Sequence, residues 1–183
     1  MPEKKNQSTQ ALRADETYRE ASAAYGGALS RLARGYEAEP EKQGDLLQEI
    51  HIAIWKSLGR FNGTCSLRTW VFRIAHNVAA SHVLRERRWK RVRMVGLEEL
   101  DTAAGTRDSL QAAAEQQALA RLTDLIRQLI PIDRQVILSY LEGMDAEAIS
   151  DLTGLSTSNV ATKIHRIKEV LRKRFGARDS DEQ

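Results

Sequence analysis

The stretch Asp145–Phe175, DAEAISDLTGLSTSNVATKIHRIKEVLRKRF, carries the clearest fold signal in the chain. Asp145 is suited to cap the start of a short helix, and Gly154 suits the left-handed position that often ends one. Ser156 can cap a second helix, whose apolar positions recur at helical spacing: Val160, Ile164, Ile167 and Leu171. Two helices joined by a short turn that contains glycine predict a helix-turn-helix.

The outward face of the second helix is polar and basic. The residues that lie off its apolar stripe are Ser158, Asn159, Thr162, Lys163 and Arg166. In a DNA-binding helix-turn-helix the second helix enters the major groove, where hydroxyl, amide and cationic side chains contact bases and phosphates. This face therefore predicts binding of duplex DNA, with a solvated helix at the end of a helical bundle as the alternative.

The rest of the chain predicts helices and no strand. Apolar residues recur every three to four positions in three further segments, as in Leu47, Ile50, Ile54 and Leu58. Alternation at period two never persists. We expect an all-α protein of two small helical domains joined by a flexible linker. The predicted divisions are a disordered tail at 1–17, a helical domain at 18–93, a linker at 94–117, the helix-turn-helix domain at 118–176, and an acidic tail at 177–183.

Composition and charge limit the possible function classes. The chain has 183 residues, a net charge of +3 and a single cysteine, Cys65, which excludes an intramolecular disulfide. The N-terminus has no apolar signal segment, and no apolar run is long enough to span a membrane, so a cytoplasmic protein is expected. Positive charge is concentrated in residues 85–93 and 163–174. Such local clusters favour a nucleic-acid partner.

Aromatic residues lie beside the first of these clusters. Phe61 and Trp70 flank the polar loop FNGTCS, and arginines follow from Arg85 onward. Unstacked bases can stack on aromatic rings while cations hold the phosphate backbone. This arrangement indicates contact with opened DNA, although a structural role in the core is the simpler interpretation for Phe72.

Two long segments resemble a known family. DLLQEIHIAIWKSLGRFNGTCSLRTWVFRIAHNVAASHVLRERR, residues 45–88, is similar to conserved region 2 of bacterial sigma factors. LIPIDRQVILSYLEGMDAEAISDLTGLSTSNVATKIHRIKEVLRKRF, residues 129–175, is similar to region 4. A chain with only these two regions resembles the extracytoplasmic-function (ECF) group. The resemblance implies a non-enzymatic subunit that binds core RNA polymerase, directs it to promoters and helps to melt the minus-10 element.

The resemblance also assigns roles to residues. The largest polymerase subunit would be bound through its clamp helices by Asp45, Leu46, Gln48 and Glu49. The minus-10 element would be bound by Phe61, Asn62, Trp70, Asn77, Arg85, Arg87, Arg88, Lys90 and Arg91. The minus-35 element would be read as duplex by Ser158, Asn159, Thr162, Lys163 and Arg166. Ala161 and Ser81 depart from the family pattern, at positions where a basic residue and an aspartate are common.

No residue pattern predicts a catalytic site, a metal site or a cofactor. The four histidines form no pair at helical metal-ligand spacing, and no Gly-rich phosphate loop is present. The expected partners are core RNA polymerase and promoter DNA, and an anti-sigma factor is a further partner common in the family. Two alternatives stay open. One is a stand-alone helix-turn-helix regulator, and the other is a sigma-like protein-interaction module.

Overall fold

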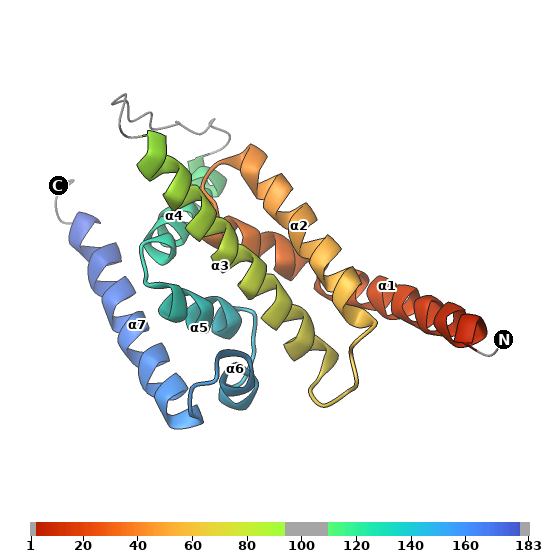
Figure 1. Cartoon of the computed structure of the whole chain (residues 1–183). Helices are drawn as coiled ribbons and strands as arrows, with labels where there is room; N and C mark the ends of the chain where they lie inside the picture. The colour runs from red at the N-terminus through yellow and green to blue at the C-terminus, as the bar shows by residue number, and fades with distance from the viewer. Residues whose placement is uncertain (1–2, 94–109, 180–183) are drawn as a thin grey trace.

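The described residues, 3–93 and 110–179 of this computed structural model, form seven helices and no strand (Figure 1). The helices are α1 (Glu3–Tyr36), α2 (Pro40–Leu58), α3 (Leu67–Arg93), α4 (Leu110–Arg127), α5 (Pro131–Leu141), α6 (Ala146–Thr153) and α7 (Thr157–Asp179). The prediction of an all-helical fold is confirmed. None of these helices is both long and apolar enough to cross a membrane.

Three segments that the sequence predicted to be irregular are helical. Helix α1 begins at Glu3 inside the expected tail, α4 begins at Leu110 inside the expected linker, and α7 continues to Asp179. The physical reason is propensity: these segments are rich in Ala, Gln, Glu and Arg, which extend a helix whose other end is packed. The indole Nε1 of Trp55 also donates to Asp15 at 2.8 Å. The rest of the predicted linker, residues 94–109, lies outside the described residues.

Helices α1, α2 and α3 pack together and form the first half of the molecule. Their shared core contains fully buried side chains from all three helices: Leu29, Leu32, Leu46, Ile50, Ile54, Val71 and Phe72. Glu37 and His82 join α1 to α3 through a 2.9 Å contact. Burial alone raises the pKa of Glu37, but hydrogen bonds from the backbone of Glu39, from His82 and from the backbone of Ala38 outweigh burial and lower it.

Helices α4 to α7 form the second half, and the local signals of the sequence explain the turn between α6 and α7. The Asp145 carboxylate accepts from the backbone N–H of Ala148 at 2.8 Å, and the Ser156 hydroxyl accepts from that of Asn159 at 3.3 Å. Gly154 has a φ of 76°, which costs glycine little because it has no Cβ. The predicted helix-turn-helix is therefore present, with Val160, Ile167 and Leu171 buried.

The two halves pack against each other and share one continuous core. In Figure 1, α5 and α6 lie alongside α3, and α7 lies on the outside. The centre of the contact is polar. His76 of α3 is fully buried, its Nδ1 lies 2.9 Å from the Tyr36 hydroxyl of α1, and its Nε2 lies 3.0 Å from the Ser139 hydroxyl of α5. Three helices from the two halves therefore meet at one imidazole.

The backbone of α1 approaches a side chain of α5 near this histidine. A Cβ placed on Gly35 of α1 would lie 2.8 Å from Cδ2 of Leu138 on α5, closer than carbon atoms tolerate. Gly26 lies in the same helix, and a Cβ there would meet nothing within 4 Å. A Cβ at position 35 would therefore require the Leu138 side chain to move, whereas a Cβ at position 26 would displace nothing.

These two glycines provide a matched test of the close approach. Gly26→Ala should raise the free energy of unfolding by about 0.5–1 kcal/mol, because alanine loses less backbone entropy in a helix. Gly35→Ala gains the same propensity but must displace Leu138, so it should give no stabilisation or a loss. Urea unfolding followed by circular dichroism measures both. Equal stabilisation by the two substitutions would show that α1 and α5 are not this close.

Burial of His76 predicts a pH dependence of stability. Desolvation lowers its pKa from 6.5 to about 3, and the neutral ring is also hydrogen-bonded on both nitrogens. Between pH 3 and pH 6.5 the imidazole is therefore protonated in the unfolded chain and neutral in the folded chain. The free energy of unfolding consequently rises with pH in this window. Between pH 7.5 and 5.5 the free energy of unfolding should fall by about 1.4 kcal/mol from this residue.

Chemical denaturation at the two pH values measures the effect. His76→Gln should remove most of this pH dependence, whatever it does to absolute stability. His51→Gln is the matched control, because His51 also has a pKa lowered by burial but is only partly enclosed. The prediction for His76 would be contradicted if the pH dependence of stability were unchanged in His76→Gln and lost in His51→Gln. That result would show that His51 causes the effect.

Candidate functional site

Helix α7 presents one polar face to solvent. Ser158, Asn159, Thr162 and Arg166 are all exposed, whereas Val160 and Ile167 between them are buried against α5 and α6. The apolar stripe fixes the rotation of the helix, and the rotation determines which side chains reach outward. Four of the five residues predicted to contact the minus-35 element therefore lie on one accessible surface.

The fifth, Lys163, is half-buried and already has a partner. Its Nζ lies 2.6 Å from a carboxylate oxygen of Asp133 at the start of α5. Lys163 can therefore contact a DNA phosphate only if it leaves Asp133 or if its ammonium group contacts Asp133 and the phosphate together. Nearby Arg166 is exposed on α7. These two cations are thus not equivalent, although the sequence pattern treats them alike.

The loop between α2 and α3 is shaped by its own side chains. Oδ1 of Asn62 accepts from the backbone N–H of Thr64 at 3.2 Å and from its hydroxyl at 2.9 Å, and Gly63 has a φ of 76°. The rings of Phe61 and Trp70 pack at 5.5 Å between centroids with an interplanar angle of 57°. The indole Nε1 of Trp70 donates to Ser57 at 3.0 Å. An aromatic pair is therefore held in place next to an ordered polar loop, with both rings partly exposed.

Helix α3 carries further predicted DNA contacts on its exposed face. Asn77 lies two helical turns after Trp70, and both project from the same side. Arg73 lies between them at i+3 from the tryptophan, and the sequence analysis did not single it out. Its guanidinium donates to the backbone carbonyl of Asp151 in α6 at 2.7 Å. The helical spacing of Trp70, Arg73 and Asn77 was the signal that could have identified it.

The basic end of α3 is paired with α2. Arg85 donates to Glu49 at 2.5 Å, and both side chains are about half exposed. One ion pair thus joins a residue predicted to bind DNA to one predicted to bind polymerase. Arg88 is exposed. The side chains of Arg87, Lys90 and Arg91 lie outside the described part of the structure.

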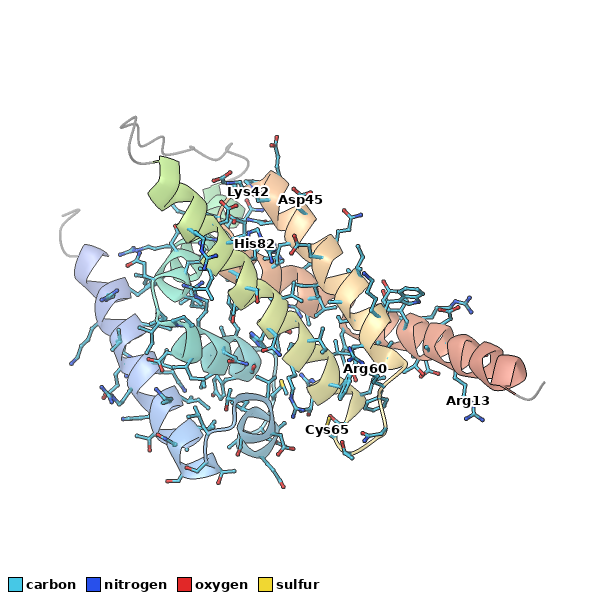
Figure 2. All side chains as sticks on the ribbon, in the orientation of Figure 1. Arg13, Lys42, Asp45, Arg60, Cys65 and His82 are labelled. Carbon is cyan, nitrogen blue, oxygen red and sulfur yellow. The ribbon has the colours of Figure 1, made fainter. Side chains whose placement is uncertain are left out.

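The outward face of α2 is acidic at one end and apolar at the other. Asp45, Gln48 and Glu49 are exposed, but Leu46 is fully buried in the core. Leu46 shares the buried stripe of Ile50 and Ile54, so in this structure its side chain holds α2 against the core and is not exposed to a partner. In Figure 2, Lys42 and Asp45 of α2 and His82 of α3 lie toward one end of the helix pair, and Arg60 and Cys65 lie at the opposite, loop end.

Two exposed apolar side chains extend this face and were missed in the sequence. Ile52 is 45% exposed and Trp55 is 49% exposed. They follow Gln48 by four and seven residues, so they continue its side of the helix. The helix periodicity could have indicated them, because neither belongs to the buried stripe. Among residues 3–93 and 110–179, no cluster of His, Cys, Asp or Glu is suited to a metal ion.

Comparison with known proteins identifies the family. The model of sigma-70 region 2 matches residues 22–89, and that of sigma-70 region 4 matches residues 119–171. The chain is 32% identical over 158 residues to the RNA polymerase sigma factor CarQ of Myxococcus xanthus, which covers 82% of each chain. It belongs to the sigma-70 family. The chain is also 30% identical over 133 residues to the ECF sigma factor SigX of Bacillus subtilis, covering 70% of this chain and 68% of SigX.

The resemblance seen in the sequence is therefore confirmed: the protein is an ECF sigma factor. Sigma factors are transcription initiation factors that bind core RNA polymerase and direct it to promoters, and this function holds for this chain as a member of the family. Its first half is region 2, and its second half contains region 4. From here α1–α3 are called region 2 and α4–α7 are called region 4.

Two solved structures share the fold. The structure of CnrH in complex with the cytosolic domain of CnrY matches with a TM-score of 0.64 and 24% identity, covering 92% of this chain and 96% of CnrH. The sigma factor RpoE in complex with the anti-sigma factor NepR from Bartonella quintana matches with a TM-score of 0.65 and 18% identity, covering 86% and 95%. At these identities the likeness concerns the fold alone.

Proposed function

We propose that this sigma factor uses three separate surfaces to initiate transcription. The face of α2 binds core polymerase, the loop after α2 together with α3 binds the minus-10 element, and the exposed face of α7 reads the minus-35 element. The observation that carries the proposal is the orientation of α7, whose buried stripe leaves Ser158, Asn159, Thr162 and Arg166 facing solvent. The N-terminal residues of a recognition helix are the ones that reach base edges.

Opening of the minus-10 element is assigned to the aromatic pair. A flipped base needs a flat apolar surface and polar groups that can read its edge. Phe61 and Trp70 supply the rings, and Asn77 lies on the same side of α3 as Trp70. Because Oδ1 of Asn62 is engaged by Thr64, the amide nitrogen of Asn62 is its group available to DNA. Arg85, Arg88 and the basic residues after them would hold the phosphate backbone.

Polymerase binding is assigned to the acidic and apolar face of α2. Asp45, Gln48 and Glu49 provide charge and hydrogen bonds, and Ile52 and Trp55 add apolar area along the same face. Exposed aromatic residues next to charged groups are typical of protein interfaces. Trp55 is oriented by its hydrogen bond to Asp15, so the N-terminal part of α1 supports this surface.

The proposal also includes a cytoplasmic location and the absence of a catalytic role for this chain. Synthesis of RNA remains with the polymerase, and the chain contributes binding and strand opening. The domain divisions are proposed as region 2 through residue 93 and region 4 from Leu110 onward, in place of the boundary at 118 expected from the sequence. An anti-sigma factor is a further proposed partner, by analogy with the solved complexes of CnrH and RpoE.

Transcription from fragmented genomic DNA of the source organism tests this function. Core RNA polymerase with the protein should give new 5′ ends that share two upstream sequence elements, and core polymerase alone should not. Core binding is measured in the same reactions. Core binding without new transcripts would support an interaction module instead. Sequence-specific binding of duplex DNA without core binding would support a stand-alone regulator.

The two cations of α7 should differ in their contribution to promoter binding. Arg166→Ala should weaken holoenzyme binding to a minus-35 element and reduce the salt slope of log K by about 1, because one phosphate contact is lost. Lys163→Ala should have a smaller effect, since Lys163 already pairs with Asp133. Filter binding or anisotropy over a range of salt concentrations measures both slopes. An unchanged slope for Arg166→Ala would remove that residue from the interface.

A further inference from the structure

The N-terminal part of α1 lies outside the segment that matches sigma-70 region 2. That match begins at residue 22, whereas α1 begins at Glu3. In Figure 1 this part of α1 projects beyond the other helices. Asp15 and Tyr18, one helical turn apart, both precede residue 22. The contacts that these two residues make therefore lie outside the part of the chain that the family pattern describes.

Two side-chain hydrogen bonds join this part of α1 to α2. The indole Nε1 of Trp55 donates to Oδ1 of Asp15 at 2.8 Å. The Tyr18 hydroxyl lies 3.1 Å from Nδ1 of His51, and the two rings meet edge to face at 6.1 Å between centroids. His51 and Trp55 lie on neighbouring turns of α2, and Asp15 and Tyr18 lie on neighbouring turns of α1. Each hydrogen bond therefore holds one turn of α1 against one turn of α2.

Trp55 benefits from this support because it is about half exposed. Its exposed fraction is 49%, and that of Ile52 is 45%. Both residues follow Gln48 on the same side of α2, so they continue the proposed polymerase-binding face. An exposed side chain samples several rotamers, and a partner that binds it must fix one of them at a cost in entropy. The Asp15 carboxylate holds the indole in one orientation before any partner binds, and this preorganisation raises affinity.

The same hydrogen bond determines which kind of surface can cover Trp55. The indole has one hydrogen-bond donor and no acceptor, and Asp15 already accepts from that donor. An interface that buries the ring therefore leaves none of its polar atoms unpaired. Ile52 has no polar side-chain atom. The surface that contacts these two side chains should be apolar, whereas the surface that faces the exposed carboxylates of Asp45 and Glu49 should carry donors or cations.

We infer that Asp15 is a positioning residue of the polymerase-binding face: it fixes Trp55 as a rigid anchor for an apolar patch of core RNA polymerase. This inference rests on the proposed function, because it takes core polymerase as the partner of Trp55. Tyr18 has a secondary part, since its contact with His51 keeps α1 beside α2 and Asp15 within reach of the indole. The N-terminal part of α1 thus prepares an interface that the matched part of region 2 provides.

Substitutions at Asp15 test the inference through the affinity of the full-length protein for core polymerase. Trp55→Ala should weaken binding by about thirtyfold, the loss typical of a tryptophan at the centre of an interface. Asp15→Ala removes the acceptor and should weaken binding by about threefold to tenfold, because the indole is no longer held in one orientation. Asp15→Asn keeps a carbonyl oxygen at the same place and should avoid most of this loss. Biolayer interferometry with immobilised core polymerase measures each affinity.

A double-mutant cycle separates positioning from other effects of the same substitution. Trp55→Phe keeps an apolar ring but has no N–H, so Asp15→Ala should have little further effect in that background. Glu16→Ala is the control for charge, because Glu16 is the exposed neighbour of Asp15 and its loss changes the net charge by the same amount. Alanine favours helix more than aspartate does, so a loss of helix propensity in α1 would not explain weaker binding. Circular dichroism measures the helix content of each variant.

The outcomes distinguish this inference from the proposed function. A wild-type protein that binds no core polymerase would contradict the proposed function and the inference with it. Normal binding by the wild type, with unchanged affinity in Trp55→Ala or in Asp15→Ala, would overturn the inference alone. Additive losses in the cycle would do the same, and so would a loss in Glu16→Ala as large as that in Asp15→Ala. A loss in Asp15→Ala that Asp15→Asn avoids, and that disappears in the Trp55→Phe background, supports the inference.

Discussion

The buried hydrogen bonds of His76 are the constraint on which the arrangement of this sigma factor depends. A buried imidazole must satisfy both ring nitrogens, and here one partner comes from α1 and the other from α5. Removal of region 4 would take Ser139 from Nε2 and open the ring to water, so the burial that lowers the pKa of His76 depends on the packed form. Arg134 of α5 lies over the Tyr36 ring at 5.2 Å and adds a cation–π contact at the same place.

Polar contacts at the edge of the shared core also join the two regions. Glu142 of region 4 accepts two hydrogen bonds of 2.7 Å from the guanidinium of Arg31 in region 2. Hydrogen bonding to Glu142 raises the pKa of Arg31, but the arginine is largely exposed, so the pair contributes modestly and can be replaced by water. The interface is specific in geometry and limited in strength.

Two cations of the proposed DNA surfaces have acidic partners within the protein. Arg85 pairs with Glu49, and Lys163 pairs with Asp133. Each pair reduces the positive field that the free protein presents to DNA, because a phosphate must compete with an internal carboxylate.

The sequence alone determined the helical fold, the helix-turn-helix and the family. Those features depend on local signals: the Asp145 and Ser156 caps, Gly154 in the left-handed conformation, and apolar stripes at helical spacing. It also determined which side of α7 faces outward, because a buried stripe leaves only one side free. The sequence did not show that Leu46 differs from its neighbours: the resemblance assigned it a polymerase contact together with Asp45, Gln48 and Glu49, but its side chain is buried in the core.

Only the tertiary structure decided how the two regions meet, because the contacts that join them are far apart in the sequence. His76, Tyr36 and Ser139 follow no periodic pattern, and a lone histidine on a helix gives no sign of its partners. The same holds for Arg73 and for Lys163, whose partners Asp151 and Asp133 are set by packing of separate helices. Local sequence signals therefore determined the helices and their polar faces. Packing between distant segments determined which side chains on those faces already have partners within the protein.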